Sequence, residues 1–225
     1  MTQSNSSQKW FIAVAGNIGV GKSSLTQLLG ERLGWKPFYE AVDENPYLED
    51  FYADMGRWSF HSQVYFLSRR LQHHRKLLDH PGHVIQDRSI YEDAEIFAKN
   101  LALQGKLSER DYQCYRDLYD GIRVFLPPPH LLIYLQAPVG VLAERIAMRG
   151  RDYERQISIE YLAELNRLYD EWVESWTTCP IFIIPAATLD YVHRPEDLEQ
   201  VATELLERLE AIQLRSSSRR GDMDS

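Results

Sequence analysis

Residues 16–23 read Gly16-Asn17-Ile18-Gly19-Val20-Gly21-Lys22-Ser23 and match the phosphate-loop pattern G-x-x-x-x-G-K-[ST] at every fixed position. Glycines in this pattern let backbone N–H groups turn toward phosphate oxygens, where a Cβ would collide. The lysine supplies a cation to the β- and γ-phosphates, and the serine hydroxyl can bind Mg²⁺. An apolar run precedes the loop and an amphipathic helix follows it. We therefore predict a nucleoside triphosphate site formed by Gly16 to Ser24.

The phosphate loop alone does not distinguish a kinase from a GTPase or a motor ATPase. A small GTPase would need an N-K-x-D sequence to recognise its base, and the chain has none. The group that accepts the phosphate must therefore be identified from other residues.

Composition limits the remaining classes of protein. A chain of 225 residues suits a single domain, and a formal net charge of −8 argues against nucleic acid or anionic membrane as a partner. The two cysteines, Cys114 and Cys179, lack metal-ligand spacing, so we expect no disulfide framework and a cytoplasmic location. No apolar run approaches the roughly 18–20 residues of a membrane span, and the polar start lacks a signal peptide.

Hydrophobic patterning predicts an α/β fold. Short, continuously apolar runs predict strands covered on both faces, at Trp10–Ala15, Pro37–Glu40, His83–Asp87, Leu131–Gln136 and Ile181–Ile184. Helical periodicity predicts a helix after the phosphate loop that ends at Gly34, and others at Trp58–Leu78, Ile90–Leu103, Ser108–Phe125, Val139–Arg149, Ser158–Trp176 and Pro195–Ile212. This alternation predicts a five-stranded parallel sheet flanked by helices on both faces. We expect one domain over residues 10–212, with disordered tails at 1–9 and 213–225.

Charged residues close two of the predicted strands. Glu40 ends the second strand, and Asp87-Arg88-Ser89 ends the third. The carboxyl ends of parallel strands face the ligand crevice, where a carboxylate can take the proton of a substrate hydroxyl. Asp43 and Glu44 are alternatives to Glu40, and a buried structural ion pair is the alternative for Asp87 and Arg88.

Three arginines lie close together in this acidic chain. Arg145 and Arg149 are four residues apart and share a helix face, and Gly150 lets the chain turn to present Arg151. Guanidinium groups match the oxygens of a transferring phosphoryl group, so the cluster predicts a polyphosphate site. A solvated charged face is the alternative.

From about Trp10 to Ile157 these motifs, in this order and spacing, resemble the deoxynucleoside kinase family, which includes deoxycytidine, deoxyguanosine and bacterial deoxyadenosine kinases. The sequence Asp43-Glu-Asn-Pro-Tyr-Leu48 is most similar to the bacterial purine branch. The resemblance implies a P-loop kinase with an Arg-rich lid at about 145–157. It further implies a homodimer that uses ATP and Mg²⁺ to phosphorylate the 5′-hydroxyl of a 2′-deoxynucleoside in nucleotide salvage.

The resemblance also implies roles for the catalytic residues. Glu40 would act as the general base on the 5′-hydroxyl, and Arg88 would lie beside it and stabilise the transferring phosphoryl group. Asp87 would hold Mg²⁺ opposite the Ser23 hydroxyl. Lys22, with the lid residues Arg145, Arg149 and Arg151, would bind the phosphates of ATP.

The remaining implied contacts concern the nucleoside. Gln63 would pair with the base. Its side-chain amide lies among apolar neighbours in the sequence and therefore needs a hydrogen-bond partner. Arg70 and Asp93 would form a pair against the base, with Arg69 as the alternative arginine. The full implied substrate set is Glu40, Tyr52, Trp58, Gln63, Arg70, Arg88, Asp93 and Glu154, in which Trp58 walls the pocket and Tyr52 and Glu154 hold the 3′-hydroxyl.

Two other functions stay open at this point. A nucleoside monophosphate kinase such as thymidylate kinase shares the loop and an arginine-bearing lid, but it needs a second cationic site for the acceptor phosphate. A non-catalytic nucleotide-binding subunit tends to lose the lysine of the phosphate loop or the catalytic carboxylates. This chain keeps Lys22, Glu40 and Asp87. Among bases, deoxyadenosine or deoxyguanosine is favoured and deoxycytidine is possible.

Overall fold

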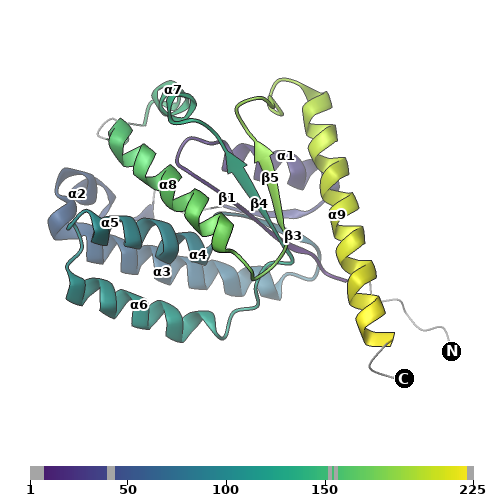
Figure 1. Ribbon diagram of the computed structural model, residues 1–225, viewed down its shortest axis with the longest axis horizontal. Coiled ribbons are helices and arrows are strands. Elements are labelled where there is room, and N and C mark those ends of the chain that lie inside the picture. Colours follow the sequence, from purple (N-terminus) through teal and green to yellow (C-terminus); the bar gives the residue numbers. More distant parts are fainter. Residues whose placement is uncertain (1–7, 40–43, 152–153, 155–156, 222–225) are drawn as a thin grey trace.

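The computed structural model describes residues 8–39, 44–151, 154 and 157–221, without the side chains of 219–221. Within these ranges five strands form one sheet in the order β2-β3-β1-β4-β5, and all neighbouring strands are parallel. The elements are β1 Phe11–Gly16, α1 Lys22–Leu33, β2 Lys36–Phe38, α2 Leu48–Ala53, α3 Met55–Asp79, β3 Val84–Asp87, α4 Ile90–Glu92, the π-helix η2 Asp93–Ala98, α5 Lys99–Leu103, α6 Glu109–Arg123, β4 Leu131–Gln136, α7 Val139–Arg149, α8 Ile159–Ser175, β5 Ile181–Pro185 and α9 Pro195–Gly221. The predicted fold class is confirmed (Figure 1).

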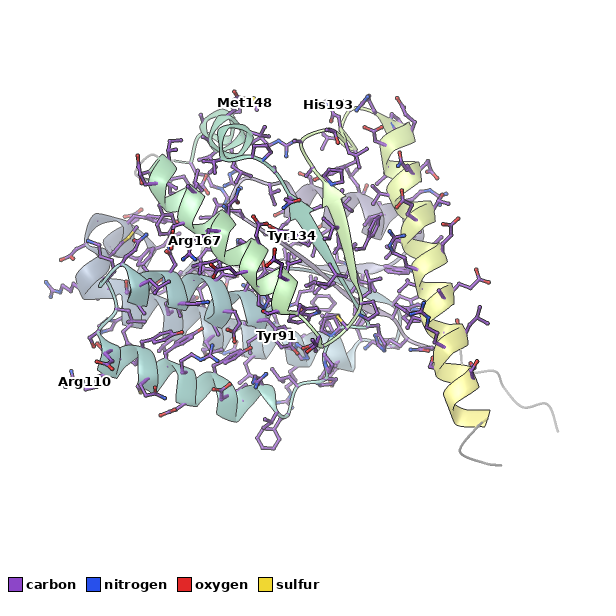
Figure 2. All side chains as sticks on the ribbon, viewed as in Figure 1. Tyr91, Arg110, Tyr134, Met148, Arg167 and His193 are labelled. Atoms are coloured by element: carbon purple, nitrogen blue, oxygen red, sulfur yellow. The ribbon has the colours of Figure 1, made fainter. Side chains whose placement is uncertain are left out.

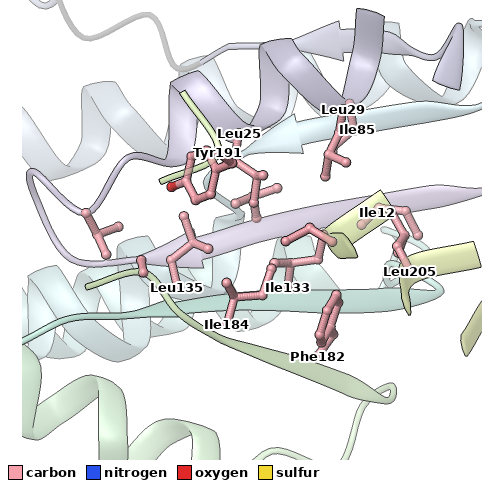
Figure 3. Close-up of a cluster of buried hydrophobic side chains, with 14 of the residues drawn as sticks. Ile12, Leu25, Leu29, Ile85, Ile133, Leu135, Phe182, Ile184, Tyr191 and Leu205 are labelled. Carbon is pink, nitrogen blue, oxygen red and sulfur yellow. The ribbon is translucent and has the colours of Figure 1, made fainter. Parts of the chain in front are cut away.

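Strand β1 lies at the centre of the sheet and divides the core into two layers. Because successive side chains of a strand point to opposite faces, Ile12 and Val14 pack with α1 and α9, while Phe11 and Ala13 pack with α3, η2 and α8. Figure 3 shows the first layer, in which Leu25 and Leu29 of α1 lie over the sheet. All side chains of β1 are buried, which explains its uninterrupted apolar sequence.

The two edge strands differ from the expected burial on both faces. Strand β5 alternates in exposure, and Ile183 is 51% exposed. Strand β2 is shorter than predicted and none of its residues is fully buried. An edge strand has a neighbour on one side only, so its apolar sequence does not ensure full coverage.

Helix boundaries follow capping residues that the periodicity did not show. Helix α3 begins at Met55 because the Asp54 side chain accepts a hydrogen bond from the Arg57 N–H at 3.2 Å. The helix predicted over 90–103 contains the π-helix η2, and α2, which buries Leu48 and Phe51, was not predicted.

Both expected tails contain ordered chain where the structure describes them. Lys9 Nζ donates to the carbonyl oxygens of Leu77 (2.8 Å) and Leu78 (2.9 Å) at the end of α3. Helix α9 continues to Gly221, beyond the predicted end at Ile212, through good helix formers and serines that bond back to the preceding turn. No helix in the described ranges is both long and apolar enough to cross a bilayer.

Candidate active site

The phosphate loop joins the central strand β1 to α1. Gly16 has a φ of 145°, and a Cβ there would lie 2.7 Å from the carbonyl oxygen of Leu135. Gly21 has a φ of 103°, and a Cβ there would lie 2.6 Å from the Tyr191 hydroxyl. Both positions therefore require glycine. Lys22 Nζ donates to the carbonyl oxygen of Gly16 at 2.8 Å, which holds the ammonium group inside the loop.

Asn17 attaches the phosphate loop to α8. Its Nδ2 donates to the Leu162 carbonyl at 3.0 Å and to Asn166 Oδ1 at 2.7 Å, while its Oδ1 accepts from the Ile18 N–H at 2.7 Å. Asn166 donates in turn to the carbonyl of Ala137 at 2.9 Å. Since Asn17 is only 2% exposed, these bonds set the position of the loop relative to α8.

Ser23 and Asp87 form a pair that fits a magnesium ion. The Ser23 hydroxyl donates to Asp87 Oδ2 at 2.5 Å. The other oxygen, Asp87 Oδ1, is buried and has no hydrogen-bond partner in the described part of the chain. Mg²⁺ binds through one or two protein oxygens and takes its other ligands from water and phosphate. An unpartnered buried carboxylate oxygen next to a serine hydroxyl is suited to that coordination.

Arg88 follows Asp87 in a left-handed backbone conformation. Its φ of 65° is the only positive value at a non-glycine residue in the described ranges. Such a conformation costs about 1–2 kcal/mol, and it persists where surrounding bonds fix it. The Arg88 N–H donates to the Val14 carbonyl at 2.9 Å, and the guanidinium lies 4.3 Å from the Phe97 ring centroid. Its Nη1 also donates to the Tyr169 hydroxyl at 3.4 Å.

Glu92 is fully buried behind the phosphate loop, a residue that sequence reasoning missed. Its Oε1 accepts from the Gly16 N–H at 3.2 Å and the Tyr169 hydroxyl at 2.8 Å. Its Oε2 accepts from the Ser89 N–H at 2.8 Å and the Ser89 hydroxyl at 3.2 Å. Burial raises the pKa of Glu92, while the nearby positive charges of Arg88 and Lys22 oppose this rise.

The far end of the pocket holds the residues implied to contact a base. Gln63, on α3, is 4% exposed and lines the pocket together with Asp93. Arg70 Nε and Nη2 donate to the two carboxylate oxygens of Asp93 at 3.1 and 3.3 Å, a two-pronged ion pair. Arg69 turns outward and pairs with Glu44. The structure therefore pairs Arg70 with Asp93, as the resemblance implies, and what this pair binds stays a prediction.

The lid residues pair with one another. Arg149 donates to both carboxylate oxygens of Glu154, at 3.0 and 2.6 Å, and Arg151 lies 3.8 Å from the same carboxylate. All three line the pocket, as does Tyr52. Four other residues of the expected lid, at 152, 153, 155 and 156, lie outside the described residues, and so does Glu40.

Two expected site residues make other contacts. Arg145 donates to the carbonyl oxygens of Val20 (3.0 Å) and Ala186 (2.8 Å), so it ties the phosphate loop to the end of β5. Trp58 is not among the described residues that line the pocket; its ring stacks on Tyr47 with centroids 5.7 Å apart and packs against the core. Helical spacing could not show which side of α3 faces the pocket.

Several apolar residues of the pocket were not predicted. They come from α2, η2 and α8, and they are Leu48, Phe51, Phe97 and Tyr161. Phe97 lies in the π-helix η2, four residues after Asp93. Side chains four residues apart share a helix face, so this spacing was the sequence signal that could have identified Phe97.

A second pocket lies on the other side of the phosphate loop. It is lined by loop residues, by Arg145, Met148, Arg149 and Arg151, and by residues 187–194 between β5 and α9. Figure 2 shows Met148 and His193 at the same end of the molecule. The two pockets share Gly19, Lys22 and Ser23, so two ligands could meet at the loop.

A phosphate loop at the carboxyl end of a parallel sheet, with a pocket on each side of it, is characteristic of P-loop kinases. The sequence model named deoxynucleoside kinase matches residues 12–210. The chain therefore belongs to the deoxynucleoside kinase family and is an enzyme.

Individual relatives agree with this assignment. The chain is 40% identical over 196 residues to the deoxyadenosine/deoxycytidine kinase of Bacillus subtilis, covering 86% of this chain and 90% of that protein. It is 36% identical over 211 residues to the deoxyadenosine kinase of Lactobacillus acidophilus, covering 89% and 97%. The solved structure of M. mycoides deoxyadenosine kinase with products dCMP and a flexible dCDP bound has a TM-score of 0.79 at 31% identity, covering 88% and 99%.

Proposed function

We propose that the chain transfers the γ-phosphoryl group of ATP to the 5′-hydroxyl of a 2′-deoxynucleoside. The observation that carries this proposal is a single pocket with Lys22 and the Ser23–Asp87 pair at one end and Gln63 with Asp93 at the other. A bond forms between the 5′-oxygen and the γ-phosphorus, and the bond from that phosphorus to the bridging oxygen of ADP breaks. Mg²⁺ held by Ser23 and Asp87 would neutralise charge on the phosphates.

Glu40 is the proposed general base that takes the proton of the 5′-hydroxyl. It lies outside the described residues, so its support comes from its position in the chain. Phe38 of β2 pairs in register with Gln86 of β3, so β2 ends beside the strand that carries Asp87 and Arg88. A carboxylate two residues beyond Phe38 has access to the same edge of the sheet.

The arginines are proposed to bind phosphate in exchange for their present partner. Arg149 and Arg151 both contact Glu154, and triphosphate oxygens would compete for these guanidinium groups. Glu154 would then be released toward the 3′-hydroxyl of the sugar, with Tyr52 beside it. Crowding of the sugar by these two side chains favours 2′-deoxyribose over ribose.

The proposed acceptor base is adenine or guanine, with cytosine also accepted. Gln63 and the Arg70–Asp93 pair offer both donors and acceptors to a base edge. The Bacillus subtilis relative is named for deoxyadenosine and deoxycytidine, and a Lactobacillus acidophilus relative at 36% identity is a deoxyguanosine kinase. We further propose that the enzyme acts in cytoplasmic nucleotide salvage as a homodimer, as the resemblance to the family implies.

The test is a phosphorylation panel of purified protein with ATP and Mg²⁺, using the four deoxynucleosides and their monophosphates as acceptors. We expect deoxynucleoside monophosphates, formed fastest from deoxyadenosine or deoxyguanosine, and little reaction with monophosphates such as dTMP. Glu40→Gln should lower kcat by at least about 100-fold. Release of ADP without any deoxynucleoside monophosphate would refute the proposal, and near wild-type turnover of Glu40→Gln would refute the choice of base.

A further inference from the structure

Glu92 occupies an unusual place for a glutamate. Its side chain is 0% exposed, yet no cation forms a salt bridge with it in the described part of the chain. Instead, it accepts hydrogen bonds from four neutral donors, two on each carboxylate oxygen: the Gly16 N–H, the Tyr169 hydroxyl, the Ser89 N–H and the Ser89 hydroxyl. Since a carboxylate has about four lone-pair sites, its acceptor capacity is filled.

These four donors belong to separate parts of the site. Gly16 starts the phosphate loop at the end of β1, and Ser89 follows Arg88 at the end of β3. Tyr169 lies on α8, and its hydroxyl accepts from Arg88 Nη1 while it donates to Glu92. Glu92 therefore bridges the loop that holds the triphosphate and the turn that presents Arg88.

The backbone of Arg88 depends on this bridge. Its left-handed conformation, φ 65°, carries a cost that neighbouring bonds must offset. The N–H of Arg88 itself donates to the Val14 carbonyl oxygen, and the N–H of the following residue, Ser89, donates to the Glu92 carboxylate. Both ends of the strained residue are thus fixed, and the guanidinium is fixed through Tyr169.

We propose that Glu92 is a positioning residue for phosphoryl transfer: it holds Arg88 and the phosphate loop in register with one another. The inference rests on the proposed function for its kinetic readout. Neither Glu92 nor Tyr169 lines the acceptor pocket among the described residues. Loss of the bridge should therefore lower kcat and leave the KM for the deoxynucleoside largely unchanged.

The main variant is Glu92→Gln, which keeps the shape of the side chain but replaces one acceptor oxygen with an NH₂ group. That group faces two donors, so the hydrogen bonds to one of the two loops are lost. We expect kcat to fall at least about tenfold, with less than about a threefold change in the KM for the deoxynucleoside. Binding of MgATP, measured by calorimetry, should weaken about threefold or more, because loss of the bonds on either side releases the phosphate loop from the turn that carries Arg88.

A second variant, Tyr169→Phe, removes the hydroxyl that links Arg88 to Glu92, leaves the Gly16 and Ser89 donors of Glu92 in place, and keeps the ring stacked on Tyr134, with centroids 5.8 Å apart. We expect a smaller fall in kcat, about threefold or more, and the double variant should fall little below Glu92→Gln alone, because both changes act through one network. Glu95→Gln is the matched control. Glu95 lies three residues further on and pairs with Arg116, and its variant should keep wild-type kcat.

The possible outcomes are separable. If wild-type protein phosphorylates no deoxynucleoside, the proposed function fails, and the change in MgATP affinity still decides the role of Glu92. If folded Glu92→Gln has a lower melting temperature but wild-type kcat and MgATP affinity, Glu92 is only structural and the proposal is overturned. A rise in KM that accounts for the whole loss would overturn it as well. If Glu92→Gln does not fold, the test uses Tyr169→Phe, Ser89→Ala and the variant that combines them. A shared network predicts that the combined loss in kcat is smaller than the sum of the two single losses. Additive losses would therefore overturn the proposal.

Discussion

Replacing His74 with asparagine should remove an acid sensitivity that is built into the core. His74 lies on α3, is 3% exposed, and packs its ring edge-on against Phe11 of β1 with centroids 5.4 Å apart. Its Nε2 has no hydrogen-bond partner among the described residues. Burial lowers the pKa of His74 from 6.5 to about 4, although the Pro127 carbonyl acts in the opposite direction.

The sign of the effect follows from this lowered pKa. Above pH 6.5 the ring is neutral in both folded and unfolded chains, so His74 gives no pH dependence. As the pH falls below 6.5 the unfolded chain binds a proton and the folded one does not, so stability is lost until the pH reaches about 4. Protonation of His74 in the unfolded chain lowers the free energy of unfolding by about 3 kcal/mol in full, and by about 2 kcal/mol at pH 5.

The assay is urea denaturation of wild type and His74→Asn at pH 7.5 and pH 5.0. His73 and His130, whose pKa values burial also lowers, contribute equally to both proteins, so the informative quantity is the difference in pH dependence. We expect the variant to lose about 2 kcal/mol less than wild type between the two pH values. His61→Asn, at an exposed position on the same helix, is the control. Equal losses in wild type and His74→Asn would refute the reasoning.

Three further changes have defined outcomes. Lys9→Met should lower the free energy of unfolding by about 1 kcal/mol, measured with urea, because Lys9 Nζ donates to carbonyl oxygens at the end of α3, one of them at 2.8 Å. Asp87→Asn should lower kcat by about 100-fold and raise the Mg²⁺ concentration needed for half-maximal rate, because the substitution removes the charge at the cation site. Ellman's reagent at pH 8 should label the exposed Cys114 and spare Cys179, since burial raises the pKa of its thiol to about 11.

Each of these has a control or a contradicting result. Lys106→Met, at an exposed position, should leave stability unchanged, and equal stability of Lys9→Met would show that water replaces its bonds. An unaltered Mg²⁺ requirement in Asp87→Asn would remove that residue from the cation site. Rapid labelling of Cys179 in folded protein would mean that its segment opens readily.

The sequence was most informative where function depends on adjacent residues. The phosphate loop is continuous in the chain, and Asp87 and Arg88 directly end a buried strand. Because the carboxyl ends of parallel strands meet at one edge, the meeting of Ser23 with Asp87 could be predicted without coordinates. The choice of Arg70 over Arg69 came from the family resemblance, since the side of α3 that is buried carries Gln63, Arg70 and His74 beside its leucines.

Other features depended on packing that no local pattern contains. Trp58 and Gln63 lie on the same helix, and only the packing of α3 against α2 and η2 decides which of them faces the pocket. Arg145 has the spacing of a phosphate ligand but bonds to two backbone carbonyls contributed by distant segments. Glu92 forms a capping box with Ser89 at the start of α4, which the sequence Ser89-Ile-Tyr-Glu92 could have shown, but its contacts with Gly16 and Tyr169 come from two other elements.

The central position of β1 has a consequence for how the protein forms during synthesis. Phe11 pairs with Val84, and Ile12 pairs with Leu131, so the strand before the phosphate loop gains its second neighbour only after more than half of the chain has left the ribosome. Such distant pairings slow folding. A nascent chain that ends before β4 lacks one wall of the strand that carries Gly16. Nucleotide binding should thus arise late, and its appearance on stalled chains of increasing length would mark the moment when the sheet closes around β1.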